Sequence, residues 1–462
     1  MSLLRRLFGG GAARPGTLET GRALHAQRRF EEALEPLREA LEAGEDPPLA
    51  ATLLSEAFGV LGDAEQADYF ASRALEADPG FAPALFQHGA LAQRRGDLAT
   101  AEASYRAALA QAPDTAAAWM NLGLIHEQRG DFPAAREHHE RAVRLQPDWA
   151  EAHFNLALQL LLQGDYERGW EEYEWRWRRE DLRGYAPHAG RRRWDGRASG
   201  ETVLVYCEQG FGDSLQFLRF VPRVRERAGR VLLECPPKLA PLFRRTPGID
   251  AVIARGEALP AFDSCIALLG LPRLLGTTLA SIPCDIPYLH PDPARAAHWA
   301  ARLAADASAL KVGLFWATDS GARTTAQRTL TLQSLAPLAR VGGATFYSLQ
   351  RGTPAREAAT PPAGMRLVDL SGELADFADD AALMASLDLV VSMDTATAHL
   401  AGALGRPAWV LTHFPPPWNW MLEREDSPWY PSVRLFRQAR GEGWSPVIER
   451  MALALAQRAA AP

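Results

Sequence analysis

The chain has 462 residues, a formal net charge of −6, and a composition that is 47% hydrophobic and 23% charged. These values predict a globular protein of two to four domains, because single domains rarely exceed about 250 residues. The acidic balance argues against nucleic acid as a partner. No run of about 18 apolar residues occurs, so we expect no membrane span.

The four cysteines are spaced roughly twenty to thirty residues apart and form no Cys-x-x-Cys pair. This spacing predicts small buried thiols in a reducing compartment rather than a metal site. Residues 1–17 have an apolar part too short for a secretory signal and are expected to form a flexible N-terminus. We therefore expect a cytoplasmic protein that needs neither a metal nor a bound cofactor.

The next region is marked by an internal repeat of 34 residues. That period is the length of a tetratricopeptide unit, a helix–turn–helix that cannot bury its apolar face alone. A Gly-Asp pair is predicted to form the turn inside each unit, and a proline to end its second helix. Small residues at fixed positions allow the two helices to approach closely. The Gly-Asp pairs are Gly62-Asp63, Gly96-Asp97, Gly130-Asp131 and Gly164-Asp165; the prolines are Pro79, Pro113 and Pro147; one set of small residues is Ser55, Gly89, Gly123 and Ala157.

We assign residues 18–181 to this repeat array. Its first helix pair is expected to be irregular, with Arg28-Arg29 in the place of Gly-Asp, because terminal repeats cap the stack. Arrays of this kind have a concave face suited to extended peptides. A protein or peptide acceptor on that face is the expected partner, with pure scaffolding or dimerisation as the alternative.

The last repeat ends in a cluster of large aromatic side chains. We expect this cluster to dock the array onto the following domain, because large aromatics are usually buried. An exposed recognition stripe is the alternative interpretation. The cluster comprises Trp170, Tyr173, Trp175 and Trp177.

Beyond a basic, glycine-rich linker at residues 182–200, the sequence predicts an α/β region of two domains, residues 201–290 and 291–462. Short apolar runs suit strands that are covered on both faces, and helical patterns lie between them. Such open sheets bind ligands at the carboxyl ends of their strands. The predicted strands are residues 202–207, 230–234, 251–254 and 264–268 in the first domain, and 311–316, 345–349, 366–368, 388–391 and 408–411 in the second.

The glycine loop after the first of these strands is the first candidate site. Gly210 and Gly212 would let the backbone approach a ligand at a helix start. Asp213 would accept a proton from an attacking hydroxyl. The alternative for Asp213 is a purely structural cap of the helix.

The second candidate site follows the strand at residues 388–391 and opens a helix that ends at Gly405. Asp394 or Thr395 is expected to cap this helix, and the free amides from Thr395 to Thr397 suit a diphosphate. His399 lies about one turn into the helix. It is either a ligand of a phosphate oxygen or a neutral core histidine.

Two further segments are expected at the same rim. Trp316 is assigned to the donor site, and the loop after it carries Arg328, whose guanidinium would neutralise phosphates. Gln350, at the end of another strand, would touch a nucleotide base. No Asp-x-Asp motif and no cluster of metal-ligand spacing accompanies these residues.

The second half of the chain resembles the heptosyltransferase-like glycosyltransferases of family 9, which have two Rossmann-like domains in the GT-B arrangement. The whole chain is similar to bacterial tetratricopeptide-repeat proteins that carry such a domain, some of which are linked to flagellin glycosylation. The resemblance rests on residues 164–177, 208–220, 388–407 and 426–431. Residues 316–319 depart from the family pattern, and only Arg328 aligns cleanly in that part.

The resemblance implies a metal-independent, inverting transfer of a sugar from a nucleotide-sugar to a protein or glycan hydroxyl. It places the acidic base at Asp213 and the donor diphosphate at Asp394, Thr395 and His399. An alternative is an adaptor whose transferase-like half is inactive or only senses sugars. The resemblance thus makes the nucleotide-sugar a co-substrate and the array the holder of the acceptor.

Overall fold

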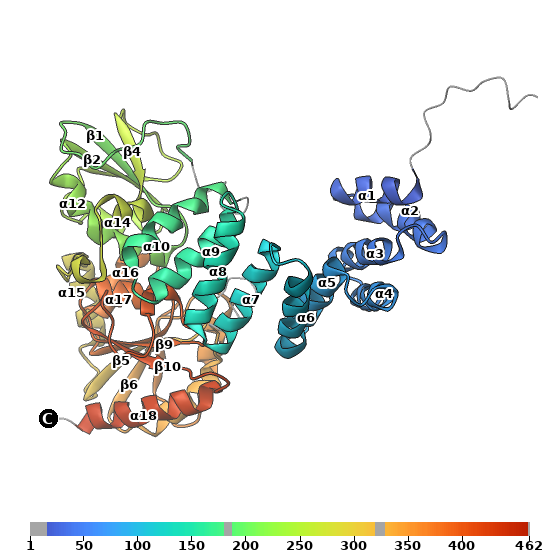
Figure 1. The fold of residues 1–462 in the computed structure, drawn as a ribbon. Coiled ribbons are helices and arrows are strands. Elements are labelled where there is room, and N and C mark those ends of the chain that lie inside the picture. Colours follow the sequence, from blue (N-terminus) through green and yellow to red (C-terminus); the bar gives the residue numbers. More distant parts are fainter. Residues whose placement is uncertain (1–15, 180–186, 319–328, 461–462) are drawn as a thin grey trace, which may run out of the picture. The chain divides into compact units, whose positions relative to one another are not determined.

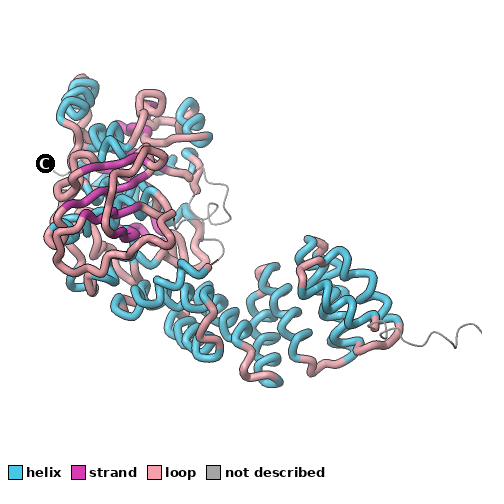
Figure 2. The backbone as a smooth tube through the Cα atoms, turned by 90° about the horizontal axis from the view of Figure 1, so that it is seen from above, coloured by secondary structure: helices cyan, strands magenta, loops and turns pink. Residues whose placement is uncertain are grey.

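The computed structural model describes residues 16–179, 187–318 and 329–460, and Figures 1 and 2 show its helices and strands. Two compact units divide the chain, one ending at Ala152 and the other beginning at His153. The first unit is a helical array, and the second contains parallel sheets and helices. The predicted fold class, a repeat array followed by an α/β region, is therefore confirmed.

Helices that pack in consecutive antiparallel pairs build the array. Their bounds are α1 Thr17–Ala26, α2 Phe30–Glu42, α3 Pro47–Leu61, α4 Ala64–Ala77, α5 Ala82–Arg94, α6 Leu98–Gln111, α7 Ala116–Arg129, α8 Phe132–Leu145, α9 Ala150–Leu162 and α10 Tyr166–Tyr173. The predicted prolines follow the ends of α4, α6 and α8, where they prevent a further helical turn.

The Gly-Asp pairs form the turns inside the repeats, as predicted. The four glycines have φ between 78° and 89°, a left-handed conformation that favours glycine. The aspartate that follows caps the next helix, since Asp63 accepts a hydrogen bond from Gln66 N and Asp97 one from Thr100 N. In the irregular first pair, Arg28 adopts the left-handed conformation in place of glycine.

The small residues at fixed positions in the repeats lie where two helices approach each other closely. A Cβ atom added to Gly123 would lie 2.5 Å from the ring of His139 on the neighbouring helix α8. The ring of His139 is fully buried there, and neither ring nitrogen has a hydrogen-bond partner among the described residues. Burial in this apolar site lowers the pKa of His139 to about 3, because the charged imidazolium loses its hydration.

The depressed pKa of His139 predicts that the array is sensitive to acid. The unfolded chain binds a proton below a pH of about 6.5, whereas the folded array does not until about pH 3. The array should therefore lose about 1.4 kcal/mol of stability per pH unit as the pH falls through that window. Urea unfolding of the wild type and of His139→Leu between pH 7.5 and pH 5 tests this. The variant should lose less stability than the wild type, and equal losses would contradict the assignment.

A four-stranded parallel sheet, in the order β3-β2-β1-β4, forms the first part of the α/β region. Its strands are β1 Thr202–Tyr206, β2 Arg230–Cys235, β3 Ala251–Ala254 and β4 Ser264–Ala267. All four agree with the predicted strands to within one residue. The end of the linker also joins this sheet, because Trp194 N donates to Cys265 O and Cys265 N donates to Arg192 O.

The segment after β1 differs from the single helix that was expected. It consists of α11 Phe211–Phe217, a 3₁₀ turn η3 Leu218–Phe220 and α12 Val221–Arg225. Pro222 lacks the backbone N–H that a continuous helix would need there. The apolar residues that recur along this segment are nevertheless all buried: Leu215, Leu218, Val221 and Val224.

A six-stranded parallel sheet, in the order β10-β9-β8-β5-β6-β7, forms the second part. Its strands are β5 Leu310–Phe315, β6 Ala344–Ser348, β7 Leu367–Asp369, β8 Leu389–Met393, β9 Ala408–Thr412 and β10 Val433–Arg437. Chain order reverses between β5 and β8, as it does between β1 and β4 in the first sheet. Ligands of doubly wound sheets bind beyond the carboxyl ends of strands at such reversals. Strand β10 was not predicted from the sequence.

Helices cover both sheets (Figure 1). Helix α15 packs against α16, held by an ion pair between Arg295 and Asp376 at 2.7 Å. The bounds are α13 Ala240–Phe243, α14 Leu271–Leu274, α15 Pro293–Leu303, α16 Phe377–Met384, α17 Ala396–Ala403 and α18 Trp444–Ala460. The 3₁₀ segments are η1 Glu174–Arg178, η4 Leu268–Gly270, η5 Leu279–Ser281, η7 Leu332–Arg340, η8 Thr353–Ala359 and η9 Trp418–Trp420.

Helix α10 packs into the core of the α/β region, so the docking prediction is confirmed. Trp170 is 2% exposed, and its ring centroid lies 5.9 Å from that of Phe217 and 5.4 Å from that of Trp418. Tyr166 accepts a hydrogen bond from Trp429 Nε1 at 3.1 Å. Although the array was assigned to residues 18–181, α10 and most of α9 thus belong to the compact unit that contains the sheets.

Three of the four cysteines are buried as expected, but Cys284 is exposed. Its segment crosses between the two sheets over the surface, which explains the difference. No group of three or more potential metal ligands occurs in the described ranges. Within the same ranges, no helix combines the length and apolarity required to cross a bilayer.

Candidate functional site

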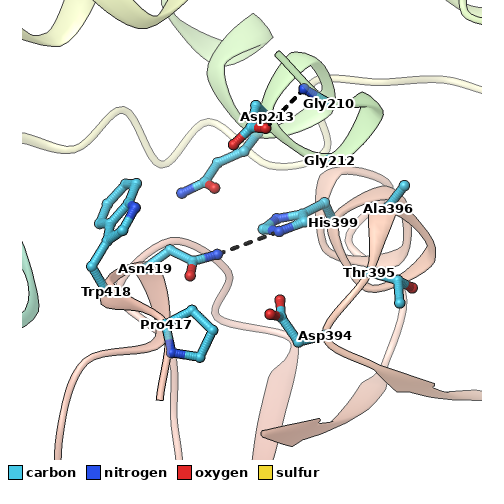
Figure 3. A pocket seen from close by; sticks show the side chains of 11 residues that line it. Gly210, Gly212, Asp213, Asp394, Thr395, Ala396, His399, Pro417, Trp418 and Asn419 are labelled. Atoms are coloured by element: carbon cyan, nitrogen blue, oxygen red, sulfur yellow. Dashed lines mark hydrogen bonds between the residues drawn. The ribbon is translucent and has the colours of Figure 1, made fainter. Parts of the chain in front are cut away.

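A pocket of about 270 Å³ lies between the first turns of α11 and α17. Helix α11 follows β1 and α17 follows β8. Each of these strands lies at the point where the strand order of its sheet reverses, so both helices begin where doubly wound sheets bind ligands. Figure 3 shows the side chains that line it. They are Gly210, Gly212, Asp213, Gln216, Asp394, Thr395, Ala396, His399, Pro417, Trp418 and Asn419.

Asp213 lies at the pocket wall formed by the first domain (Figure 3). One of its carboxylate oxygens accepts a hydrogen bond from Gly210 N at 3.1 Å, which stabilises the start of its own helix. The structural and the chemical interpretations of Asp213 are therefore compatible, because the same carboxyl group caps the helix and borders the pocket.

Both glycines of this loop line the pocket, and their close approach to a ligand stays a prediction. Gly210 has a φ of −79°, and Gln209 before it has a φ of 64°. The left-handed conformation, which is costly for a residue other than glycine, thus falls on Gln209. A Cβ atom on Gly212 would lie 3.0 Å from His399 Cδ2, so Gly212 makes room for α17 of the other domain.

The last repeat helix supports the strained residue. The hydroxyl of Tyr173, at the end of α10, is hydrogen bonded to the side-chain amide of Gln209 at 3.1–3.2 Å. Burial raises the pKa of Tyr173 far above its ordinary value, so the hydroxyl stays neutral at physiological pH. Helix α10 thus contacts the residue of the glycine loop that has the left-handed conformation.

A buried ion pair ties the same loop to the segment after α10. Arg176 lies 3.2 Å from Glu208 and 2.5 Å from Glu174, and the side chains of Arg176 and Glu208 are both almost fully buried. Loss of hydration raises the pKa of Glu208 to about 7, against the attraction of Arg176. Because one guanidinium is shared by two carboxylates, it does not fully stabilise the charge on Glu208.

Asp394 directly follows strand β8 at the opposite wall of the pocket and is 5% exposed. Its Oδ1 accepts a hydrogen bond from Trp420 Nε1 at 2.7 Å. Thr395 is the N-cap of α17, but its hydroxyl is within 3.1 Å of Ser392 Oγ and makes no capping hydrogen bond. The first-turn amides of α17 are therefore not covered by a side-chain cap from Thr395.

His399 is nearly buried and also lines the pocket, and its predicted contact with a phosphate oxygen stays a prediction. The amide Nδ2 of Asn419 lies 3.3 Å from its Nε2 and the hydroxyl of Tyr430 lies 3.0 Å from its Nδ1. Both ring nitrogens therefore lie within hydrogen-bonding distance of an uncharged polar group. A network of aromatic and amide groups thus fixes the ring.

The loop after β9 supplies the third wall. Trp418 and Asn419 belong to η9, and Arg437 holds this segment by donating to the backbone oxygens of Trp420 and Met421. Desolvation lowers the pKa of Arg437 to about 10, so it remains charged at neutral pH. These residues were not predicted from the sequence, although the run from Pro415 to Trp420 follows a strand of the same sheet.

Six of the ten predicted site residues line the pocket. Thr397 lies on α17 but does not line the pocket. Trp316 and Gln350 are buried outside the pocket. The side chain of Gln350 accepts hydrogen bonds from Trp316 N and Ala317 N at 3.0 Å, so here it stabilises the strand ends. Arg328 falls outside the described residues, and its role stays a prediction.

The lining combines two carboxylates with amide, imidazole and indole groups, and it contains no arginine or lysine among the described residues. Carboxylates and amides bind hydroxyl groups well, because they supply both acceptors and donors. Negative charge in the lining disfavours a phosphate inside the pocket itself. The arrangement therefore suits a neutral, hydroxyl-rich group next to a carboxylate base.

Comparisons with known proteins agree with the repeat assignment. A tetratricopeptide-repeat family model matches residues 86–148 and 128–174. The curated protein FlbA of Caulobacter vibrioides is 33% identical over an alignment that covers 63% of this chain and 52% of FlbA. The chain thus spans about half the length of this curated relative.

Two solved structures illustrate the two parts of the chain. MamA from Desulfovibrio magneticus covers 35% of this chain and 94% of its own, with 24% identity and a TM-score of 0.30. A glycosyl transferase of family 9 from Veillonella parvula covers 57% of this chain and 98% of its own, with 11% identity and a TM-score of 0.43. Both TM-scores are below 0.5, so we draw no functional argument from them. Residues 86–174 are tetratricopeptide repeats on the strength of the family model and of their helix pairs.

Proposed function

We propose that the protein is a glycosyltransferase that moves a sugar from a nucleotide-sugar to a hydroxyl group of a protein or glycan acceptor. The observation that carries the proposal is one pocket in which Asp213 of the first domain faces the start of α17 in the second. The family resemblance of the sequence in both of these segments supports the same activity.

The proposed reaction is a single displacement that inverts the anomeric carbon. Asp213 takes the proton of the acceptor hydroxyl as its oxygen attacks that carbon. The bond between the anomeric carbon and the phosphate oxygen breaks, and the nucleoside diphosphate leaves. No metal is required in this scheme, because the amides at the start of α17 stabilise the leaving diphosphate. Arg328 is proposed to add positive charge there.

We assign the repeat array to recognition of the acceptor. Tetratricopeptide arrays hold extended peptides on their concave face, and a protein acceptor needs a binding surface larger than the pocket described here. A nucleotide-sugar and a protein or peptide are therefore the proposed partners.

A sugar-sensing scaffold is the second candidate function. It is favoured by the bond between Asp213 and Gly210 N, because a carboxylate that only caps its helix would produce the same geometry. Transfer and sensing both require binding of a nucleotide-sugar, whereas a plain adaptor does not.

Calorimetry with a panel of UDP-, GDP-, ADP- and dTDP-hexoses tests the proposal. We expect at least one of them to bind with a micromolar to millimolar Kd, the range of most enzyme substrates. A mass increase on proteins co-expressed with the chain then distinguishes transfer from sensing. Failure of every nucleotide-sugar to bind would contradict both transfer and sensing.

A further inference from the structure

One polar side chain of the pocket is not used by the proposed reaction. Gln216 lies on α11, three residues after Asp213, so both side chains emerge from the same face of the helix. Both line the pocket. The side chain of Gln216 therefore lies one helical turn from the proposed base.

The amide of Gln216 is buried without a partner. The residue is 1% exposed, and its Nε2 makes no hydrogen bond with any described residue. Its backbone oxygen, by contrast, accepts from Arg219 Nε at 2.9 Å, which fixes this part of the helix. A buried donor without an acceptor destabilises a protein, and an apolar side chain of the same size would avoid that cost.

The other groups in the pocket indicate what Gln216 binds. Asp213 and Asp394 are acceptors for hydroxyl protons, Asn419 offers an amide, and Trp418 offers an aromatic ring (Figure 3). No cationic side chain accompanies them among the described lining residues. This set matches a sugar ring, whose hydroxyls donate and accept, better than it matches a phosphate.

The size of the pocket agrees with a single ring. Its volume of about 270 Å³ is below the range of about 300–1,000 Å³ that encloses whole drug-sized ligands. The nucleoside of a nucleotide-sugar would thus lie outside the pocket, with its diphosphate at the edge of the pocket where α17 begins. The sugar would occupy the pocket itself, beside Gln216.

We infer that Gln216 is a specificity-determining residue whose side-chain amide donates a hydrogen bond to an oxygen of the transferred sugar. This inference rests on the proposed function and deepens it, because it separates recognition of the sugar from recognition of the nucleotide. Removing the amide should weaken the affinity for the nucleotide-sugar and leave the affinity for the nucleoside diphosphate unchanged.

The test compares wild type with Gln216→Met, which has a similar length and no donor. Calorimetry measures binding of UDP-, GDP-, ADP- and dTDP-hexoses and of the matching nucleoside diphosphates. We expect the variant to bind the preferred nucleotide-sugar about three- to tenfold more weakly, as the loss of one hydrogen bond predicts. Its affinity for the nucleoside diphosphate should not change, and its Tm should equal or exceed that of the wild type.

Gln159→Met provides the matched control. Gln159 on α9 is also buried and also has an amide atom without a partner, but it does not line the pocket. The control should leave the affinities for nucleotide-sugars and nucleoside diphosphates unchanged.

Three results would overturn the inference, and they are distinguishable. Equal affinity of wild type and Gln216→Met for the nucleotide-sugar would remove the role of Gln216 and leave the proposed function intact. Equal affinity of the wild type for nucleotide-sugar and nucleoside diphosphate would show that the pocket does not recognise the sugar. Binding of neither ligand by the wild type would overturn the proposed function as well.

Discussion

Asp213→Asn is expected to lower the rate of sugar transfer by about 10²–10⁴-fold, the usual contribution of a general base. The asparagine keeps an oxygen that accepts from Gly210 N, so the hydrogen bond at the start of α11 is preserved. What the variant loses is the negative charge that takes up the proton of the attacking hydroxyl. Affinity for the nucleotide-sugar should therefore stay within about twofold of the wild type, because the proposed contacts to the nucleotide are made by the start of α17 and not by Asp213.

The measurement is the mass increase on co-expressed proteins, together with the affinity for the nucleotide-sugar by calorimetry. Asp131→Asn is a matched control, because Asp131 caps a helix of the repeat array by accepting from Ala134 N at 3.2 Å. It should leave transfer unchanged. Transfer at the wild-type rate in Asp213→Asn would show that this carboxyl group is only a cap, and the sensing function would then be favoured.

Trp170→Ala is expected to cost the second compact unit about 3–5 kcal/mol of its free energy of unfolding, as is typical of a buried tryptophan. The indole packs against Phe217, on the helix that carries Asp213, and against Trp418, which lines the pocket. Without the indole, both α11 and Trp418 would lose a packing contact that holds them at the candidate site. Transfer should fall together with stability.

Urea unfolding of wild type, Trp170→Ala and Trp170→Phe measures this effect. The phenylalanine variant fills most of the cavity and should lose less stability than the alanine variant. A loss below about 1 kcal/mol in Trp170→Ala would mean that α10 contributes little to the α/β core. Such a result would also remove the structural link between the last repeat and the pocket.

Local sequence signals predicted most of the fold. The Gly-Asp turns, such as Gly62-Asp63, were found because left-handed backbone and helix caps favour these residue types wherever they occur. The strand at β1 was found because a parallel strand covered on both faces is a continuous apolar run. Strand β10, at the edge of its sheet, was missed because two arginines interrupt the apolar run in Val433–Arg437.

The candidate site was predicted only in part. Asp213 and Asp394 were found because each follows a predicted strand at the start of a helix. Trp418 and Asn419 were missed because they lie in a proline-rich segment without periodicity. Gln216 was missed because its significance is the burial of an amide without a partner, which is a property of its surroundings.

By itself, the sequence determined the repeat period, the parallel strands and the two helix starts, because each depends on residues that are close in the chain. Only the tertiary structure decided that α10 joins the α/β core, that Tyr173 supports the strained Gln209, and that Gly212 makes room for His399. These contacts join segments separated by tens to hundreds of residues, and no local propensity encodes them. They depend instead on which surfaces are complementary once the elements have formed.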